Sequence, residues 1–132
     1  MTWEEEVEKI ERVAHSLGID PLFVAAIRKA EGGRDGREFG VLSVPAPDYN
    51  SQLRICCNTV KNFLAAYDTN PFSVIMSKGA IKRLIYSGNF IASFARKWAP
   101  IGAENDPRNL NRNWFTNVTN WYSKFVAQGL LP

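Results

Sequence analysis

The stretch KAEGGRDGREFGV (residues 29–41) places a carboxylate where an apolar helix gives way to glycines. Phe23, Ile27 and Glu31 are four residues apart, so each step drifts by only about 40° around a helix and Glu31 falls near the edge of the buried face. Burial disfavours the charged form of a carboxyl group and raises its pKa. A raised pKa is what a general acid needs near neutrality. Two interpretations stay open: Glu31 leans into solvent at a helix end, or it acts as an acid in a cleft.

Apolar residues at spacings of three and four predict helices on both sides of this stretch. A capping box of Thr2 and Glu5 begins a helix that Gly18 ends, and Asp20 with Pro21 begins the helix that ends at Glu31. Further helices are predicted at about 51–67, 89–98 and 114–128, with one or two short helices at 72–86. The Asp-Gly turn at 35–36, followed by REFGVLSV, predicts a small β-hairpin after the second helix.

The composition indicates one globular domain over residues 1–132. The chain is 45% hydrophobic, with a net charge of +3 that suits an anionic partner such as cell wall, nucleic acid or membrane. Its basic residues are spread along the chain, so we do not expect a nucleic-acid partner. Cys56 and Cys57 are adjacent and are not expected to pair. With His15 as the single histidine, neither a metal site nor a cofactor is expected.

Two segments resemble the lysozyme-like superfamily, in particular the soluble lytic transglycosylases and goose-type lysozymes: IDPLFVAAIRKAEGG and, after a short turn region, FGVLSV. The later WAPIGAENDPRNLNRNWFTNV is similar to segments of phage and prophage lysozyme-like proteins. NWFTNV and YSGNF stand roughly where transglycosylases carry YV.NV and AYNAG. The usual S..GA.GLMQ is replaced by EFGVLSVPAPDYN, which has no matching glutamine. The resemblance implies a mainly α fold of about six helices around a sugar-binding groove, with the hairpin after the second helix.

The resemblance also implies an enzyme that cleaves the MurNAc–GlcNAc β-1,4 bond of peptidoglycan, as a lytic transglycosylase or a muramidase. Glu31 matches the catalytic acid, while Ser43 and Tyr86 are loose counterparts of a polar contact and a tyrosine. The expected substrate contacts are Phe39, Ser43, Tyr86, Trp98, Asn105, Asp106, Asn113 and Asn117. The asparagine-rich segment has another interpretation, a solvated loop that caps the next helix, and Trp98 and Trp114 fall on apolar stripes typical of core residues.

A second catalytic carboxylate is not identified by spacing. The candidates are Asp35, Glu38, Asp48, Glu104 and Asp106. Many glycosidases use two carboxyl groups, whereas lytic transglycosylases are held to need only one glutamate. The absence of an obvious partner therefore favours the transglycosylase reaction.

The alternative function is a non-catalytic lysozyme-like component of a phage particle, structural or wall-binding. In either case the expected partner is the glycan strand of bacterial peptidoglycan, and the protein is expected to be monomeric or part of a phage particle. The N-terminal segment is acidic and amphipathic, so no signal peptide and no membrane insertion are expected. Synthesis in the bacterial cytoplasm would then be followed by virion delivery or by release to the wall.

Overall fold

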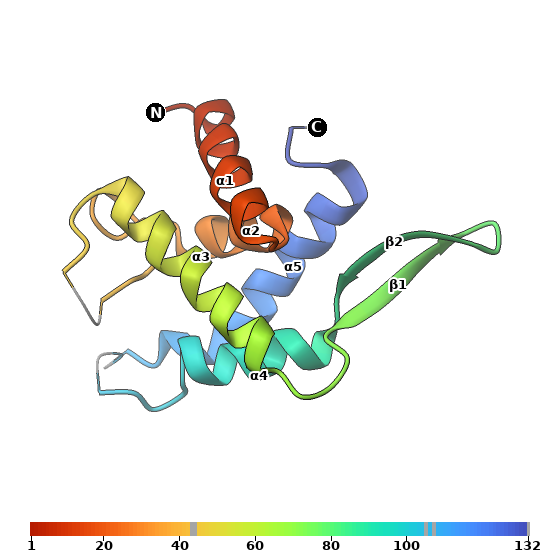
Figure 1. The fold of residues 1–132 in the computed structure, drawn as a ribbon. Coiled ribbons are helices and arrows are strands. Elements are labelled where there is room, and N and C mark those ends of the chain that lie inside the picture. The colour runs from red at the N-terminus through yellow and green to blue at the C-terminus, as the bar shows by residue number, and fades with distance from the viewer. Residues whose placement is uncertain (43–44, 105, 107, 132) are drawn as a thin grey trace.

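The computed structural model describes residues 1–42, 45–104, 106 and 108–131. Within these residues, five α-helices and one two-stranded sheet form the fold (Figure 1). The helices are α1 (Trp3–Leu17), α2 (Pro21–Glu31), α3 (Tyr49–Ala66), α4 (Gly88–Trp98) and α5 (Trp114–Gln128), and the strands are β1 (Phe72–Ser77) and β2 (Ala80–Tyr86). A 3-10 turn, η1 (Leu110–Asn113), precedes α5. The mainly α class with a small hairpin is therefore confirmed. Among the described residues, no helix has both the length and the apolar character that crossing a membrane requires.

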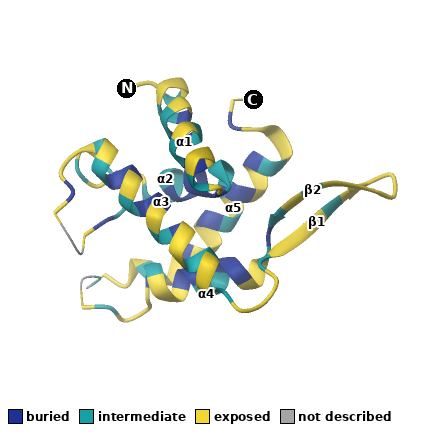
Figure 2. Ribbon diagram, in the orientation of Figure 1, coloured by how far each residue is buried: buried dark blue, intermediate teal, exposed yellow. Residues whose placement is uncertain are grey.

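Helix α2 is the central element, and it packs against α1 and α5 (Figure 2). The side chain of Asp20 accepts a hydrogen bond from the backbone N–H of Leu22, and Pro21 occupies the first turn, as the sequence predicts. Five consecutive residues of this helix, from Phe23 to Ile27, are buried. Such all-round burial is typical of a core helix rather than of an amphipathic surface helix. The last residue of α2 is Glu31, so the core holds the backbone that carries this carboxylate.

An aromatic cluster fills the space between α2, α4 and α5. The Phe23 ring makes edge contacts with Tyr86, Phe94 and Tyr122 at centroid distances of 5.3 to 5.7 Å. The Tyr86 hydroxyl accepts a hydrogen bond from the Asp20 backbone N–H, and the Tyr122 hydroxyl donates to the Asp20 carboxylate. Tyr86 is 4% exposed. Its prediction as a substrate contact is wrong, because the ring and hydroxyl are both used inside the core.

The hairpin is formed by residues 72–86, where the sequence analysis expected one or two short helices. It follows α3, not α2, so its predicted position is also wrong. The strands pair antiparallel from Phe72↔Tyr86 to Ser77↔Ala80. Lys78 and Gly79 connect them, both with positive φ (53° and 80°), as a two-residue hairpin turn of the primed type requires. Phe72, Val74 and Met76 alternate before this Lys-Gly pair, which is the two-residue period of a strand and not the period of a helix.

The described part of the segment between α2 and α3 contains no strand, although a strand was predicted there. Its backbone groups bond to a side chain of α3 instead. The amide oxygen of Gln52 accepts from the N–H groups of Phe39 and Val41. The amide nitrogen donates to the carbonyl groups of Gly36, Val41 and Ala46. Gln52 is fully buried and takes the place that a neighbouring strand would have as hydrogen-bond partner.

An arginine of α2 holds the other end of the same segment. The Arg28 guanidinium forms an ion pair with Glu6 of α1, at 2.7 Å between Nε and Oε1. It also donates to the backbone carbonyl groups of Gly33 and Glu38. Both ionic side chains are largely shielded from solvent, which makes this pair less sensitive to salt than a surface pair. Segment 33–41 is thus tied to α2 and α3, and through Arg28 to α1.

Candidate active site

Glu31 lies at the C-terminal end of α2 and points into a contact with α5. The indole N–H of Trp114 donates to Oε1 of Glu31 at 2.8 Å. Trp114 is the first residue of α5 and is buried, which confirms that its ring belongs mainly to the core. A tryptophan N–H can donate but cannot accept, so it bonds both the ionised and the protonated carboxyl group through the carbonyl-type oxygen. The hydrogen bond from Trp114 fixes Oε1 of Glu31, and Oε2 lies against another part of the chain.

The second oxygen of Glu31 faces Gly40. A Cβ atom on residue 40 would overlap Oε2, and the Gly40 backbone has φ +73°, a conformation that side chains rarely adopt. Gly32 ends the helix in a left-handed conformation, and a Cβ on Gly33 would overlap the backbone carbonyl of Arg37. The glycine that leaves room for the Glu31 carboxyl group is therefore Gly40, whereas Gly32 and Gly33 serve the chain reversal.

Burial raises the pKa of Glu31, and the hydrogen bond from Trp114 opposes this shift in part. In the described part of the chain, no lysine or arginine forms an ion pair with Glu31. The thiol of Cys56 is buried in α3, where burial, with smaller contributions from Cys57 and the Glu31 charge, raises its pKa well above the ordinary value. The surroundings of Glu31 thus favour its protonated form, as a general acid requires.

Glu31 lines a cleft of about 830 Å³ between the ends of several elements. This volume is within the range of small-ligand sites. The lining residues come from α2, the 40–42 segment, α3, the end of α4, the 99–113 segment and α5: Ala30, Glu31, Gly40, Val41, Leu42, Ile55, Thr59, Lys97, Trp98, Ala99, Pro100, Ala103, Asp106, Leu110, Asn111, Asn113, Trp114 and Asn117. Amide, hydroxyl and ammonium groups therefore share this surface with apolar side chains.

The structure brings half of the predicted contact residues to this cleft. Trp98, Asp106, Asn113 and Asn117 line it together with Glu31. Trp98 is half-buried and stacks on Phe94 at 5.6 Å between ring centroids, and Phe94 also packs against Trp114. The ring of Trp98 is thus held from within the core while part of it stays accessible.

Of the remaining predicted contacts, Ser43 and Asn105 lie outside the described residues. Phe39 is fully buried and packs edge-on against Tyr49 at 5.5 Å between centroids. Its prediction as a substrate contact is wrong for the same reason as that of Tyr86, because both aromatic rings are occupied in the core.

The second acid in the cleft, Asp106, is used by the backbone. Its Oδ1 accepts from the N–H of Leu110, and its Oδ2 accepts from the N–H of Asn111. The carboxylate therefore organises the turn before α5. Among the other candidates, Asp48 caps α3, and Oε2 of Glu38 accepts from the N–H of Gly36.

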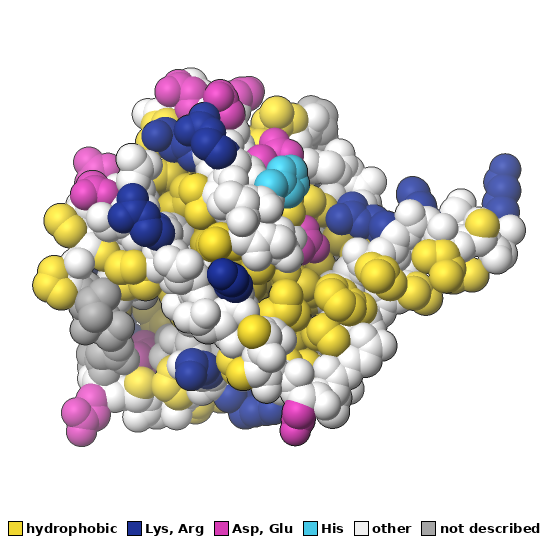
Figure 3. Space-filling model, in the orientation of Figure 1, with side chains coloured by type: hydrophobic (Ala, Val, Ile, Leu, Met, Phe, Trp, Pro, Cys, Tyr) yellow, Lys and Arg dark blue, Asp and Glu magenta, His cyan; other side chains and the backbone are white. Residues whose placement is uncertain are grey.

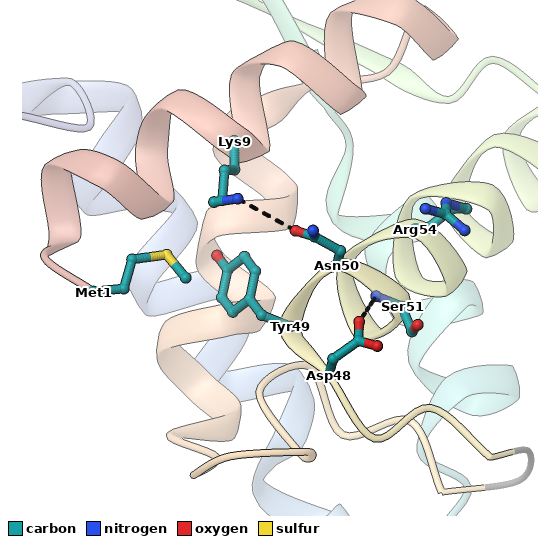
Figure 4. A pocket seen from close by; sticks show the side chains of 7 residues that line it. All are labelled: Met1, Lys9, Asp48, Tyr49, Asn50, Ser51 and Arg54. Carbon is teal, nitrogen blue, oxygen red and sulfur yellow. Dashed lines mark hydrogen bonds between the residues drawn. The ribbon is translucent and has the colours of Figure 1, made fainter.

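Another pocket, of about 430 Å³, lies between α1 and the first turn of α3 (Figure 4). Lys9 donates to the side-chain oxygen of Asn50, and the Ser51 N–H donates to Asp48 at 2.7 Å. The hydrogen bonds from Ser51 lower the pKa of Asp48, so this carboxylate stays ionised. The pocket thus offers no proton donor of the kind present at Glu31.

Sequence reasoning missed three residues that shape the site, namely Arg28, Gly40 and Gln52. Gln52 falls on the same side of α3 as Leu53 and Cys56, and a polar residue on an apolar stripe is a detectable signal. Arg28 acts through hydrogen bonds to other segments, and Gly40 acts through its backbone conformation and its missing side chain, so neither leaves a local sequence signal. Comparison with known proteins adds no relationship: no family model, no curated protein and no solved structure matches the chain.

Proposed function

We propose that this protein is a peptidoglycan lytic enzyme that cleaves the MurNAc–GlcNAc β-1,4 bond with Glu31 as its general acid and base. The observation that carries the proposal is the Glu31 carboxyl group, half-buried at a cleft wall with a raised pKa and one neutral donor, Trp114. A carboxyl group whose surroundings favour the protonated form, beside an open cleft, is suited to donate a proton to a glycosidic oxygen.

The lining of the cleft suits an amino-sugar polymer. Asn111, Asn113 and Asn117 offer amide groups that both donate and accept, which matches hydroxyl and N-acetyl groups. The accessible part of Trp98 offers an aromatic face to a sugar ring. The cleft would then act as the sugar-binding groove of the enzyme.

The reaction begins with proton transfer from Glu31 to the glycosidic oxygen. The bond between this oxygen and C1 of MurNAc breaks, and positive charge develops at C1 as in other glycosidases. The Glu31 carboxylate then takes a proton from the hydroxyl group that attacks C1. If the attacking group is the C6 hydroxyl of the same MurNAc, a 1,6-anhydro end forms without consumption of water. If it is water, the product is a reducing end.

A single-carboxylate mechanism is favoured by the position of Asp106. Both of its oxygens already accept backbone hydrogen bonds, so its use as a nucleophile or base would disrupt the turn before α5. Glu31 would then serve first as acid and later as base, and we favour the transglycosylase reaction for this reason.

The test is mass spectrometry of purified peptidoglycan after digestion by wild-type protein, Glu31→Gln and Glu4→Gln. Glu4 is an exposed acid of α1 that does not line the cleft, and it provides the matched control. We expect anhydro-muropeptides from wild type and the control, and a rate lower by about 10²–10⁴-fold in Glu31→Gln. Equal release by Glu31→Gln would refute the proposal. Wall binding by wild type without any released product would instead support a non-catalytic phage component.

A further inference from the structure

The hairpin carries an apolar face that no other part of the described chain covers. In its register, Phe72 lies opposite Tyr86, Val74 opposite Leu84 and Met76 opposite Ile81, so these side chains share one face. Apart from the buried Tyr86, they are exposed, and the two nearest the turn are 51% (Met76) and 67% (Ile81) accessible. Figure 3 shows hydrophobic side chains along one side of the projecting hairpin.

The same hairpin is entirely cationic in its charged residues. It contains Lys78 in the turn, Lys82 beside the β-bulge and Arg83 on strand β2, and no acid between residues 72 and 86. Arg83 pairs with Ile75 and so lies on the face opposite to the apolar one. Basic groups gather at the tip and along the other side of the projecting hairpin (Figure 3). The hairpin is therefore amphipathic, with an exposed apolar face and with cations at its turn, at its bulge and on its other face.

This charge pattern is complementary to an anionic lipid surface. We propose that the hairpin lies in the interfacial plane of a bilayer with anionic headgroups, with its apolar face toward the acyl chains and its cations among the phosphates. An in-plane position is favoured because entry by the tip would bring the Lys78 ammonium into the acyl region first. The inference replaces the expectation of no membrane insertion, and it is independent of the reaction at Glu31.

A second copy of the chain is a less suitable occupant. The ladder is irregular between Ile75 and Met76, and a bulge of this kind disfavours addition of another strand. A second hairpin would cover the apolar face, but it would supply no acid for the three cations of the first. An anionic bilayer meets both the apolar and the cationic requirement.

The base of the hairpin is firmly attached, so the body would follow it to the surface. The Ser87 N–H donates to the Pro71 carbonyl at 2.8 Å, and the Phe72 ring packs against Tyr86 at 6.0 Å between centroids. Tyr86 in turn belongs to the aromatic core. A two-stranded hairpin is marginal on its own in water, and contact with lipid would cover the face that the protein leaves exposed.

The test is co-sedimentation of the full chain with phosphatidylcholine vesicles, with and without an equal part of phosphatidylglycerol. We expect binding to the anionic vesicles only. The double variant Met76→Ser/Ile81→Ser is expected to bind at least about tenfold more weakly, since apolar insertion is lost. Lys78→Gln/Lys82→Gln is expected to lose about fivefold for each lysine.

Two matched variants control for hydrophobicity and charge. Ile101→Ser/Leu131→Ser removes exposed apolar side chains elsewhere, and Arg34→Gln/Lys61→Gln removes two exposed cations elsewhere. Both control variants are expected to bind anionic vesicles more tightly than the hairpin variants do, with an affinity close to that of wild type. Failure of wild type to bind anionic vesicles, or equal losses in the control variants, would refute the proposal. Sedimentation velocity without lipid distinguishes a lipid surface from a second copy of the chain. A dimer that Met76→Ser/Ile81→Ser abolishes would assign the apolar face to a second copy.

Discussion

The segment between α2 and α3 and the hairpin after α3 differ in how their backbone groups are hydrogen-bonded and in whether their apolar side chains are buried. The hairpin satisfies its backbone by a regular ladder, yet its apolar side chains project into solvent. The described part of the first segment has no strand, yet Phe39 and Val41 are buried and their N–H groups bond to Gln52. Helices therefore position Glu31 and Trp114, whereas side-chain hydrogen bonds from neighbouring helices hold the segment that contains Gly40.

The largest effect is expected from Gln52→Leu, which removes the hydrogen bonds that hold the segment between α2 and α3. The substitution keeps an apolar side chain in the core but leaves several buried N–H and carbonyl groups without partners, at a cost of about 1–3 kcal/mol each. We expect the free energy of unfolding to fall by at least about 5 kcal/mol, with loss of the site around Gly40. Chemical denaturation followed by circular dichroism measures this. Asn58→Leu on the exposed side of α3 is the control, and an equal loss there would contradict the role given to Gln52.

A smaller effect is expected from Gly40→Ala, which tests the close packing of residue 40 against Glu31. The new Cβ would overlap Oε2 of Glu31, and the left-handed backbone adds strain of about 1–2 kcal/mol. Gly18→Ala is the matched control, because Gly18 has a similar φ of +69° with no neighbouring atom near its Cβ. Both variants carry the backbone strain, and Gly40→Ala should lose more stability in thermal unfolding because only its Cβ overlaps a neighbouring atom. Only Gly40→Ala should lose wall-degrading activity, by at least about tenfold, and equal activity in both would separate Gly40 from the site.

The sequence predicts the helical framework because each helix carries its own signals. Thr2, Asp20 and Pro21 cap or begin helices where they were expected to, and the apolar spacing leads to Glu31 at the end of α2. The hairpin was missed because the apolar residues of 72–86 were interpreted with helical spacing, although a Lys-Gly pair separates two short apolar runs.

The candidate site is less visible in the sequence because its contacts join distant residues. The bond between Glu31 and Trp114 spans 83 positions, and no local pattern predicts it. Phe39 and Tyr86 were assigned to the substrate although the core uses both rings, since an aromatic residue suits either environment. Gly40 depends on a carboxylate that comes from another element, so only the folded chain reveals its role.

The burial of Glu31 gives a pH-dependent prediction that sharpens the same comparison. Its pKa is raised in the folded protein, so the folded state binds a proton more tightly than the unfolded chain does. The contribution of Glu31 to stability is therefore fully present below the ordinary pKa of 4.5 and is lost as the pH rises through the raised value. Glu31→Gln removes the ionisation. Its melting temperature, relative to wild type, should increase between acid and neutral pH, and a difference that is constant with pH would contradict the burial of the charge.

The smallest effect is expected in the hairpin, whose apolar face has no partner within the described chain. Met76→Ser/Ile81→Ser removes side chains that are already more than half exposed, so little apolar burial is lost on folding. We expect the free energy of unfolding in the absence of lipid to change by no more than about 0.5 kcal/mol. Phe90→Ala, in the aromatic core beneath the hairpin base, should cost about 3–5 kcal/mol in the same denaturation experiment. A large loss of unfolding free energy in the hairpin variant would mean that the apolar face packs against the body in solution. The hairpin and the segment between α2 and α3 would then both bury their apolar side chains.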